Sequence, residues 1–272
     1  MKKMRTFIIS TVLVLSFISC KNKETKIHHN NSIAEHSKDE TTKHWSYEGE
    51  TSPEHWTEIE KNTNCDGKRQ SPINIIDIDS KHVSKDSLNL KISYNTQTII
   101  HDIINNGHTV QFDFELGDSI WYKNEVFNLK QLHFHESSEH TVDGIRYPIE
   151  IHLVHTNKTG KFTVLSILGK EGKEHANFEF LEFFLPIKNG ETKTIGKPFD
   201  LKLIFPSNIN EYYSYEGSLT TPPCSETVNW IVFKQPIVLS LNQVLKLKKN
   251  MPLNNYRNEQ LINNRVVFKT FE

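Results

Sequence analysis

The segment Gln131-Leu132-His133-Phe134-His135 alternates polar and apolar side chains, which is typical of a β-strand. On a strand, His133 and His135 point to one face together with Gln131, while Leu132 and Phe134 point to the other. Two imidazoles that share a strand face can bind one metal ion, and the apolar side chains can anchor the back of the strand in a core. The segment therefore predicts a buried strand that carries metal ligands.

A second run, Ile149-Glu150-Ile151-His152-Leu153-Val154-His155, repeats this alternation. It places Glu150, His152 and Val154 on one face. Three neutral imidazoles that leave a fourth coordination position free are what a catalytic zinc ion needs. A solitary strand histidine is more often a hydrogen-bonded core or surface group, but the two segments together favour a metal site. The pattern alone does not decide between His152 and His155 as the third ligand.

Length and composition indicate a soluble globular protein with one large domain. The chain has 272 residues, of which 36% are hydrophobic and 24% charged, and this is enough for a sizeable core. The formal net charge is −1, and no basic cluster is interleaved with aromatic residues. We therefore expect no nucleic-acid partner.

The N-terminus has the features of an export signal. A basic start, Met1 to Arg5, precedes an uncharged apolar run, Thr6 to Ser19, which is too short to span a membrane comfortably. The run ends in Phe17-Ile18-Ser19-Cys20, which resembles a bacterial lipoprotein processing site. We expect a signal peptide over residues 1–19 and a lipid on Cys20 that holds the protein at a membrane surface of the periplasm or cell envelope. The alternative is an ordinary cleaved signal with an incidental cysteine.

The remaining chain divides into a polar tether and a folded domain. Residues 20–43 are rich in polar and charged residues and contain too few apolar side chains to offset the entropy of ordering, so they predict a disordered tether. The domain is expected over residues 44–272. Its two cysteines, Cys65 and Cys224, are free to form a disulfide in the oxidising compartment to which export leads.

Short alternating runs and turn residues predict a sheet-dominated domain with a few short peripheral helices. Strands are expected at Leu88–Ile92, Val110–Phe114, Ile120–Tyr122 and Phe162–Leu168, and helices after Ser52 (carrying Trp56), at Phe178–Leu185 and at Ser240–Lys249. No internal repeat is visible.

From His44 to its C-terminus the chain resembles the alpha-class carbonic anhydrases. Six motifs in order carry the resemblance: Lys68–Ile75, Asn106–His108, Gln131–His135, Ser138–Asp143, Glu150–His155 and Tyr215–Pro223. The resemblance implies a predominantly β, single-domain fold around a large twisted mixed, mostly antiparallel sheet, with zinc at the foot of a conical cleft. It also suggests cis peptide bonds at Ser71–Pro72 and Pro222–Pro223.

The resemblance implies one Zn²⁺ per chain, bound by His133, His135 and His152. Ligating histidines need their second nitrogen held by a partner. Gln131 and Glu150 share strand faces with His133 and His152 and are placed for this role, and the resemblance gives His135 a backbone carbonyl near Asn255. It places the rival histidines, His140 and His155, in structural hydrogen bonds.

The resemblance also assigns the reacting groups. Thr220 is the gatekeeper, whose hydroxyl orients a zinc-bound hydroxide while donating to an ionised Glu139. Substrate contacts fall on Thr220, Thr221 and an apolar wall formed by Val154, Val164, Leu219 and Trp230. His108 is the proton shuttle, because histidine titrates near neutral pH. The residues expected to order the relay waters are Tyr47, Asn106 and Gln111.

These expectations together predict an enzyme, a zinc-dependent carbonic anhydrase that interconverts carbon dioxide and bicarbonate by attack of the zinc-bound hydroxide. A catalytically silent carbonic-anhydrase-like binding module is the alternative, but such modules typically lose zinc histidines. A zinc esterase is a second alternative, although no carboxylate is placed as in an HExxH helix.

Overall fold

The computed structural model describes residues 44–272, which belong to one compact unit. The expected signal peptide, the expected lipidation site at Cys20 and the expected tether lie outside the described residues. None of the described helices has both the length and the apolar character that crossing a membrane requires.

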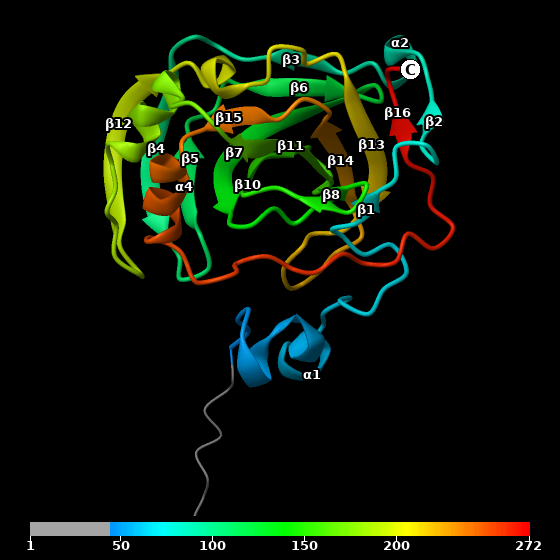
Figure 1. The fold of residues 1–272 in the computed structure, drawn as a ribbon, viewed down its shortest axis with the longest axis horizontal. Helices are drawn as coiled ribbons and strands as arrows, with labels where there is room; N and C mark the ends of the chain where they lie inside the picture. The colour runs from blue at the N-terminus through cyan, green and yellow to red at the C-terminus, as the bar shows by residue number, and fades with distance from the viewer. Residues whose placement is uncertain (1–43) are drawn as a thin grey trace, which may run out of the picture. The chain divides into compact units, whose positions relative to one another are not determined.

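Strands make up most of the regular structure (Figure 1). The strands are β1 (Asn74–Ile75), β2 (Lys81–His82), β3 (Lys91–Ser93), β4 (Thr98–Asn105), β5 (Val110–Phe114), β6 (Ser119–Tyr122), β7 (Glu125–His135), β8 (Thr141–Val142), β9 (Ile145–Arg146), β10 (Ile149–Thr156), β11 (Phe162–Glu171), β12 (Thr192–Phe199), β13 (Tyr212–Gly217), β14 (Val228–Phe233), β15 (Ile237–Leu239) and β16 (Phe268–Lys269). The α-helices are α1 (Trp56–Ile59), α2 (Lys85–Leu88), α3 (Glu179–Glu182) and α4 (Leu241–Lys248). Short 3₁₀ turns lie at Gly49–Thr51, Pro53–His55, Ala176–Phe178 and Leu201–Ile204.

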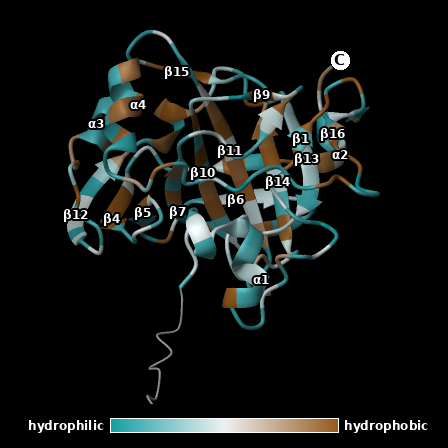
Figure 2. Cartoon of the chain, turned by 60° about the horizontal axis from the view of Figure 1, so that its bottom comes forward, coloured by the Kyte–Doolittle hydropathy of each residue, from teal (hydrophilic) through white to brown (hydrophobic). Residues whose placement is uncertain are grey.

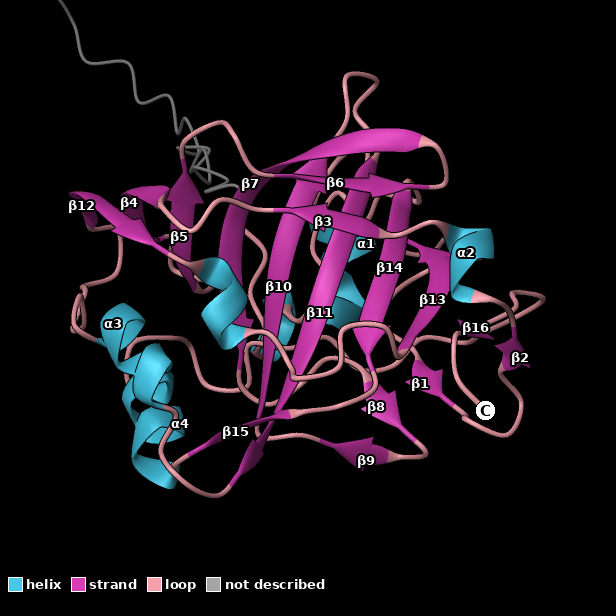
Figure 3. Ribbon diagram, turned by 90° about the horizontal axis from the view of Figure 1, so that it is seen from above, coloured by secondary structure: helices cyan, strands magenta, loops and turns pink. Residues whose placement is uncertain are grey.

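One 13-stranded mixed sheet organises the domain. Its main path runs β12-β4-β5-β7-β10-β11-β14-β13-β16-β2, and a separate three-stranded sheet has the order β1-β8-β9. Most pairs are antiparallel, but β11 pairs in parallel with both β14 and β15. Figure 3 shows β10, β11 and β14 side by side in the middle of the sheet. The predicted fold class is confirmed.

The two faces of the central strands have different surroundings. Leu132 and Phe134 are fully buried in the larger core cluster, as the alternation of the segment predicts. Hydrophobic residues concentrate along the strands and polar residues in the loops, as Figure 2 shows. The opposite face of β7 is therefore available for polar side chains that remain largely shielded from water.

Two of the predicted elements are corrected. Leu88–Ile92 is not one strand, because Ser84 caps the helical turn α2 and Asn89 ends it with a left-handed backbone (φ 52°), so β3 starts only at Lys91. The helix expected over Phe178–Leu185 shrinks to the single turn α3. Pro186 comes directly after Leu185, the last residue of the expected helix, and a proline disfavours helical geometry in the residue before it.

Other predictions are confirmed. The strands at Val110–Phe114, Ile120–Tyr122 and Phe162–Leu168 are present as β5, β6 and β11. The helix at Ser240–Lys249 is present as α4, with Ser240 and Gln243 forming a capping box. Ser71–Pro72 and Pro222–Pro223 are both cis.

Cys65 and Cys224 form the expected disulfide, with an S–S distance of 2.03 Å, and are 159 positions apart in the chain. The bridge packs with the fully buried Trp56, against which Trp45 and Tyr47 also pack. It thereby fastens the N-terminal part of the described chain to the loop that follows β13. A disulfide of this kind is typical of proteins outside the reducing cytoplasm.

Candidate metal centre

Strand register brings three histidines together on one face of the sheet. β10 pairs with β7 so that His152 lies opposite His133 and Glu150 lies opposite His135. The ring centroids are 5.0 Å apart for His133 and His135, 5.1 Å for His133 and His152, and 4.7 Å for His135 and His152. The structure thus places the predicted ligand set in a single cluster whose nitrogens could hold a metal ion.

The outward-facing nitrogen of each ring meets an oxygen acceptor. His133 Nδ1 lies 2.8 Å from Gln131 Oε1, His135 Nδ1 lies 2.6 Å from the Asn255 backbone oxygen, and His152 Nε2 lies 2.7 Å from Glu150 Oε1. Because these oxygens only accept, each outward nitrogen must carry the hydrogen. The inward nitrogen of each neutral ring therefore carries no hydrogen and presents a lone pair.

The three inward lone pairs point at a common region. His133 Nε2 lies 3.1 Å from His135 Nε2 and 3.3 Å from His152 Nδ1. Lone pairs at this separation repel unless a cation lies between them, and a tetrahedral zinc ion with bonds of 2.0–2.1 Å would hold its nitrogens about 3.3 Å apart. The donor set therefore fits zinc.

Burial supports the neutral state of these rings. Removal from water lowers the pKa of His133, His135 and His152, in the case of His135 to about 4. Neutral imidazole is the form that binds metal, so the site is prepared for a cation rather than for protons.

The two rival histidines are engaged in other hydrogen bonds. His155 Nε2 lies 2.5 Å from the Tyr94 hydroxyl, and its Nδ1 lies 3.1 Å from the Thr163 backbone oxygen. His155 lies three residues along β10 from His152, so its side chain points to the opposite face of the strand. His140 has both nitrogens in hydrogen bonds, to Glu150 Oε1 and to the Tyr215 hydroxyl, each at 2.7 Å.

Glu150 anchors the third ligand from a fully buried position. Its Oε2 accepts the backbone N–H groups of Glu139 and His140, and its Oε1 accepts from His140, His152 and Ser166, all at 2.6–2.8 Å. Burial alone would raise the pKa of this carboxyl, but His140 and His152 beside it hold the pKa well below its usual range. Glu150 is therefore an ionised acceptor, which fixes the His152 tautomer.

Glu139 is buried beside the cluster. Its Oε1 accepts a hydrogen bond from the backbone N–H of Arg257 at 3.0 Å. Its Oε2 lies 3.5 Å from His135 Nε2 and has no hydrogen-bond partner within residues 44–272. The pKa of Glu139 is raised, because burial and the nearby Glu150 outweigh the lowering by His152, the backbone N–H of Arg257 and the hydroxyl of Thr220. The expected neighbours Glu139 and Thr220 are thus brought together at the cluster.

Arg257 is a residue that the sequence analysis missed. It is 2% exposed, and its guanidinium donates to Gln70 Oε1, the Ser71 oxygen and the Cys65 oxygen at 2.7–3.0 Å. It therefore ties Glu139 to the disulfide-bonded segment. No local pattern marks it, since it is a solitary arginine in an irregular C-terminal stretch.

The predicted apolar wall lies in one cluster. Val154, Val164 and Trp230 are buried together, and the partly buried Leu219 packs against them. The Trp230 ring lies 4.9 Å from the His152 ring, and its Nε1 donates to the Ser218 oxygen at 3.0 Å. The bond to Ser218 fixes the start of the loop that carries Thr220 and Thr221, and Cys224 fixes its end. Thr220 is 6% exposed, and Thr221 is half-buried.

His108 lies in a turn shaped by its neighbours. Asn106 Oδ1 accepts the N–H groups of His108 and Thr109, each at 2.9 Å, around Gly107 with its positive φ of 85°. The His108 ring stacks on Trp45, with centroids 3.7 Å apart. Burial, and then the neighbouring His44, lower the pKa of His108.

The other residues expected to order waters are placed near this turn or beside the ligand strand. Tyr47 presents its edge to the His108 ring at 6.3 Å, and Gln111 is paired with His133 across β5 and β7. Gln111 Nε2 also donates to Asp113 Oδ1 at 2.6 Å. Their part in a water relay remains a prediction.

The side chain of Asn255 makes a connection that the sequence did not reveal. Its amide nitrogen donates to the His108 and Phe134 backbone oxygens, each at 3.0 Å, and its Oδ1 accepts the Glu136 N–H at 2.8 Å. Its own backbone oxygen holds His135. One fully buried residue thus joins the His108 turn to the ligand strand.

Comparisons with known proteins agree with this geometry. The family model described as eukaryotic-type carbonic anhydrase matches residues 51–271. The chain belongs to this family. The carbonic anhydrase of Klebsiella pneumoniae is 40% identical over 230 residues, which cover 83% of this chain and 91% of the relative. That of Pectobacterium carotovorum is 36% identical over 227 residues, which cover 82% of this chain and 90% of the relative.

Solved carbonic anhydrases share the fold. The alpha-carbonic anhydrase of Thermovibrio ammonificans, solved in complex with the inhibitor sulfanilamide, superposes with a TM-score of 0.78 at 39% identity, covering 83% of this chain and 99% of that one. The alpha-carbonic anhydrase of Photobacterium profundum gives a TM-score of 0.75 at 33% identity, covering 83% and 100%.

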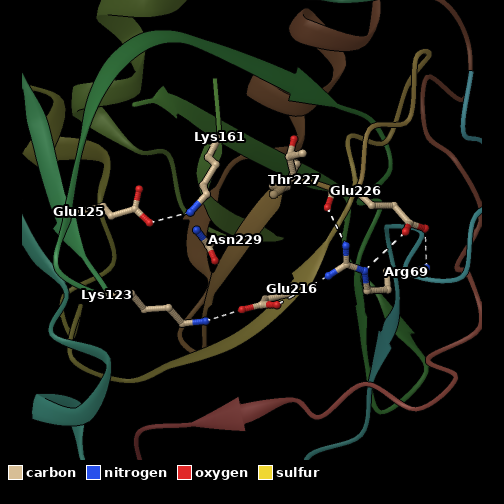
Figure 4. A pocket seen from close by; sticks show the side chains of 9 residues that line it. Arg69, Lys123, Glu125, Lys161, Glu216, Glu226, Thr227 and Asn229 are labelled. Atoms are coloured by element: carbon tan, nitrogen blue, oxygen red, sulfur yellow. Dashed lines mark hydrogen bonds and ion pairs between the residues drawn. The ribbon is translucent and has the colours of Figure 1, made fainter. Parts of the chain in front are cut away.

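A separate hollow of about 460 Å³ is lined by charged side chains (Figure 4). Three ion pairs line it. The Nζ atom of Lys161 lies 2.9 Å from Glu125 Oε1, and that of Lys123 lies 2.9 Å from Glu216 Oε1. Arg69 Nε lies 3.5 Å from Glu226 Oε2. These three cations and three carboxylates neutralise one another in pairs. The hollow therefore has no excess charge with which to attract an ion, and the histidine cluster remains the candidate site.

We predict that one zinc ion binds per chain and that its affinity depends on Glu150. His152→Ala should abolish tight binding, and Glu150→Gln should weaken it about 10- to 100-fold, because the third imidazole loses the acceptor that fixes its tautomer. The measurement is zinc content together with competition against a chelator. His101→Ala, which changes an exposed histidine beside Asp102, is the control. Unchanged zinc affinity in His152→Ala would contradict the assignment.

Proposed function

We propose that this protein catalyses the reversible hydration of carbon dioxide to bicarbonate and a proton. The observation that carries the proposal is the convergence of three inward lone pairs from His133, His135 and His152. Family membership supports the same reaction. The cation would be held by His133 Nε2, His135 Nε2 and His152 Nδ1. Zinc bound there would supply Lewis acidity that lowers the pKa of a coordinated water toward neutrality, as is established for carbonic anhydrases as a class.

The chain's own groups orient the reactants. Thr220 would accept a hydrogen bond from the attacking oxygen while it donates its own hydroxyl hydrogen to the carboxylate of Glu139, whose pKa its hydroxyl lowers. The backbone N–H of Arg257 donates to Oε1 of that carboxylate at 3.0 Å, which restricts rotation of the Glu139 side chain. Orientation of this kind favours attack because the lone pair of the nucleophile is fixed toward the substrate.

The apolar wall suits an uncharged substrate. Carbon dioxide has no charge and forms weak hydrogen bonds, so side chains such as Val154, Val164 and Trp230 can receive it without leaving polar groups unsatisfied. Thr221 and the backbone of Thr220 would contact the more polar bicarbonate product. Leu219 completes the wall beside them.

The alternatives are less well supported. A catalytically silent binding module would not need the three imidazoles, Glu139 and Thr220 together, and all of these are present here. An esterase would require a carboxylate placed as a general base, whereas Glu150 and Glu139 are both occupied with holding other groups. Ester hydrolysis would at most be a side reaction.

We predict rapid carbon dioxide hydration that depends on metal, measured by stopped flow. Chelation or His152→Ala should abolish it, readdition of zinc should restore only the chelated wild type, and sulfanilamide should inhibit. Thr220→Val should retain zinc but lower kcat/KM about 10- to 100-fold, because the nucleophile loses its orientation. Full activity in the metal-free protein or in His152→Ala would refute the proposed reaction.

We further propose that His108 carries the product proton away from the centre. Its ring is half-buried and its turn is tied to the ligand strand through Asn255. Burial and the neighbouring His44 lower the pKa of His108, so the ring is neutral at neutral pH and has one nitrogen lone pair available for a proton in transit. Tyr47, Asn106 and Gln111 would order the intervening waters.

His108→Ala should lower kcat about tenfold or more in dilute buffer and leave kcat/KM unchanged, because only the proton-transfer step loses its carrier. Imidazole added as buffer should restore the rate. The measurement is the dependence of kcat on buffer concentration, with His101→Ala as the control. A loss that imidazole does not restore would count against the shuttle role.

The N-terminal sequence supports export and a lipid anchor at Cys20, and the disulfide supports a location outside the cytoplasm. We predict that wild-type protein fractionates with cell-envelope membranes, while Cys20→Ala is released from them. Fractionation followed by immunodetection tests this. Membrane association that persists unchanged in Cys20→Ala would rule out the anchor.

A further inference from the structure

Two imidazoles and a carboxylate form a row beside the His108 turn. His108 Nε2 lies 3.3 Å from His44 Nε2, although the residues are 64 positions apart, and His44 Nδ1 lies 3.1 Å from Glu60 Oε1. The side chain of His44 is 69% exposed and that of Glu60 is 29% exposed. The row therefore leads from a half-buried ring to solvent.

The carboxylate determines the protonation of the row. An ionised carboxylate only accepts hydrogen bonds, so His44 Nδ1 must carry a hydrogen. Neutral His44 then has a lone pair on Nε2, and a hydrogen on His108 Nε2 is what makes the 3.3 Å contact attractive. The remaining lone pair of neutral His108 is on Nδ1, so this is the atom that can accept a proton.

Trp45 aligns both ends of the row. Its backbone N–H donates to Glu60 Oε1 at 3.3 Å, while its ring stacks on His108 with an angle of 12° between the planes. Packing of Trp45 against the buried Trp56 anchors it to the domain, with ring centroids 5.2 Å apart. The relative positions of His108, His44 and Glu60 are thus set by one anchored residue.

We propose that His44 is a second proton carrier, which takes the proton from His108 and delivers it to buffer, and that Glu60 is a positioning residue that fixes the His44 tautomer. The inference rests on the proposed function and extends its proton path by one step.

The transfer is balanced. When a proton binds to His108 Nδ1, the hydrogen on His108 Nε2 moves to His44 Nε2, and the Glu60 carboxylate balances the positive charge on His44. A buffer base then removes the proton from His44 Nε2. His108 regains its starting tautomer by exchange with water, so one proton leaves and no other bond changes. Burial and the neighbouring His44 lower the pKa of His108, which favours release of its proton to the next carrier.

The test compares kcat for carbon dioxide hydration in dilute buffer across single variants of the zinc-loaded protein. His44→Ala should lower kcat about two- to tenfold with kcat/KM unchanged, and imidazole should restore the rate. Combined with His108→Ala, it should cause no further loss, because both residues serve one path. His55→Ala is the matched control, since His55 is also an exposed histidine of this segment and lies 3.3 Å from its own carboxylate, Glu58.

A second measurement does not depend on turnover. Nitrogen-15 NMR of the neutral imidazoles should show His108 protonated at Nε2 and His44 at Nδ1. In Glu60→Gln, whose amide can either donate or accept, both rings should become mixtures of tautomers.

Three results would overturn the inference. His44→Ala could behave as His55→Ala does while His108→Ala is slow and rescued by imidazole, in which case the proposed function stands and this step fails. The loss in His44→Ala could persist at high imidazole or extend to kcat/KM, which would indicate a structural role. Wild-type protein that does not hydrate carbon dioxide would refute the proposed function and this inference with it.

Discussion

The candidate metal site depends on the direction in which three imidazoles present their nitrogen lone pairs. Each ring is held from behind by an oxygen that can only accept, and this forces the hydrogen outward and the lone pair inward. Facing lone pairs at 3.1–3.3 Å are unfavourable without a cation. The affinity of such a site for a metal ion therefore depends on the hydrogen-bond acceptors behind the imidazoles as much as on the imidazoles themselves.

The surrounding contacts make the arrangement rigid. Glu150 receives five donors and cannot turn away from His152, while Asn255 holds His135 by its backbone and the His108 turn by its side chain. Arg257 connects Glu139 to the segment that carries Cys65. The proposed metal ligands, the proposed orienting carboxylate and the proposed proton carrier therefore belong to one hydrogen-bonded framework, so a change in one contact is expected to reach the others.

The sequence was sufficient to predict the strands that carry the histidines, because their alternation of polar and apolar side chains determines which face each side chain occupies. Apolar Leu132 and Phe134 must face a core, which sends His133 and His135 to the opposite face. The sequence could not choose between His152 and His155, since the Tyr94 hydroxyl that engages His155 is 61 positions away in the chain. Local propensity also failed at Leu88–Ile92, where the left-handed Asn89 ends a helical turn. Long-range contacts such as those of Arg257 and the His44–His108 pair leave no local pattern.

The most direct test of the central claim is a crystal structure of the zinc-loaded protein with anomalous data collected at the zinc absorption edge. We expect one strong peak about 2.0–2.1 Å from His133 Nε2, His135 Nε2 and His152 Nδ1, with Gln131, Asn255 and Glu150 still holding the outward nitrogens. A peak on His140 or His155 instead, or three rings that bridge one another through hydrogens with no bound metal, would contradict it.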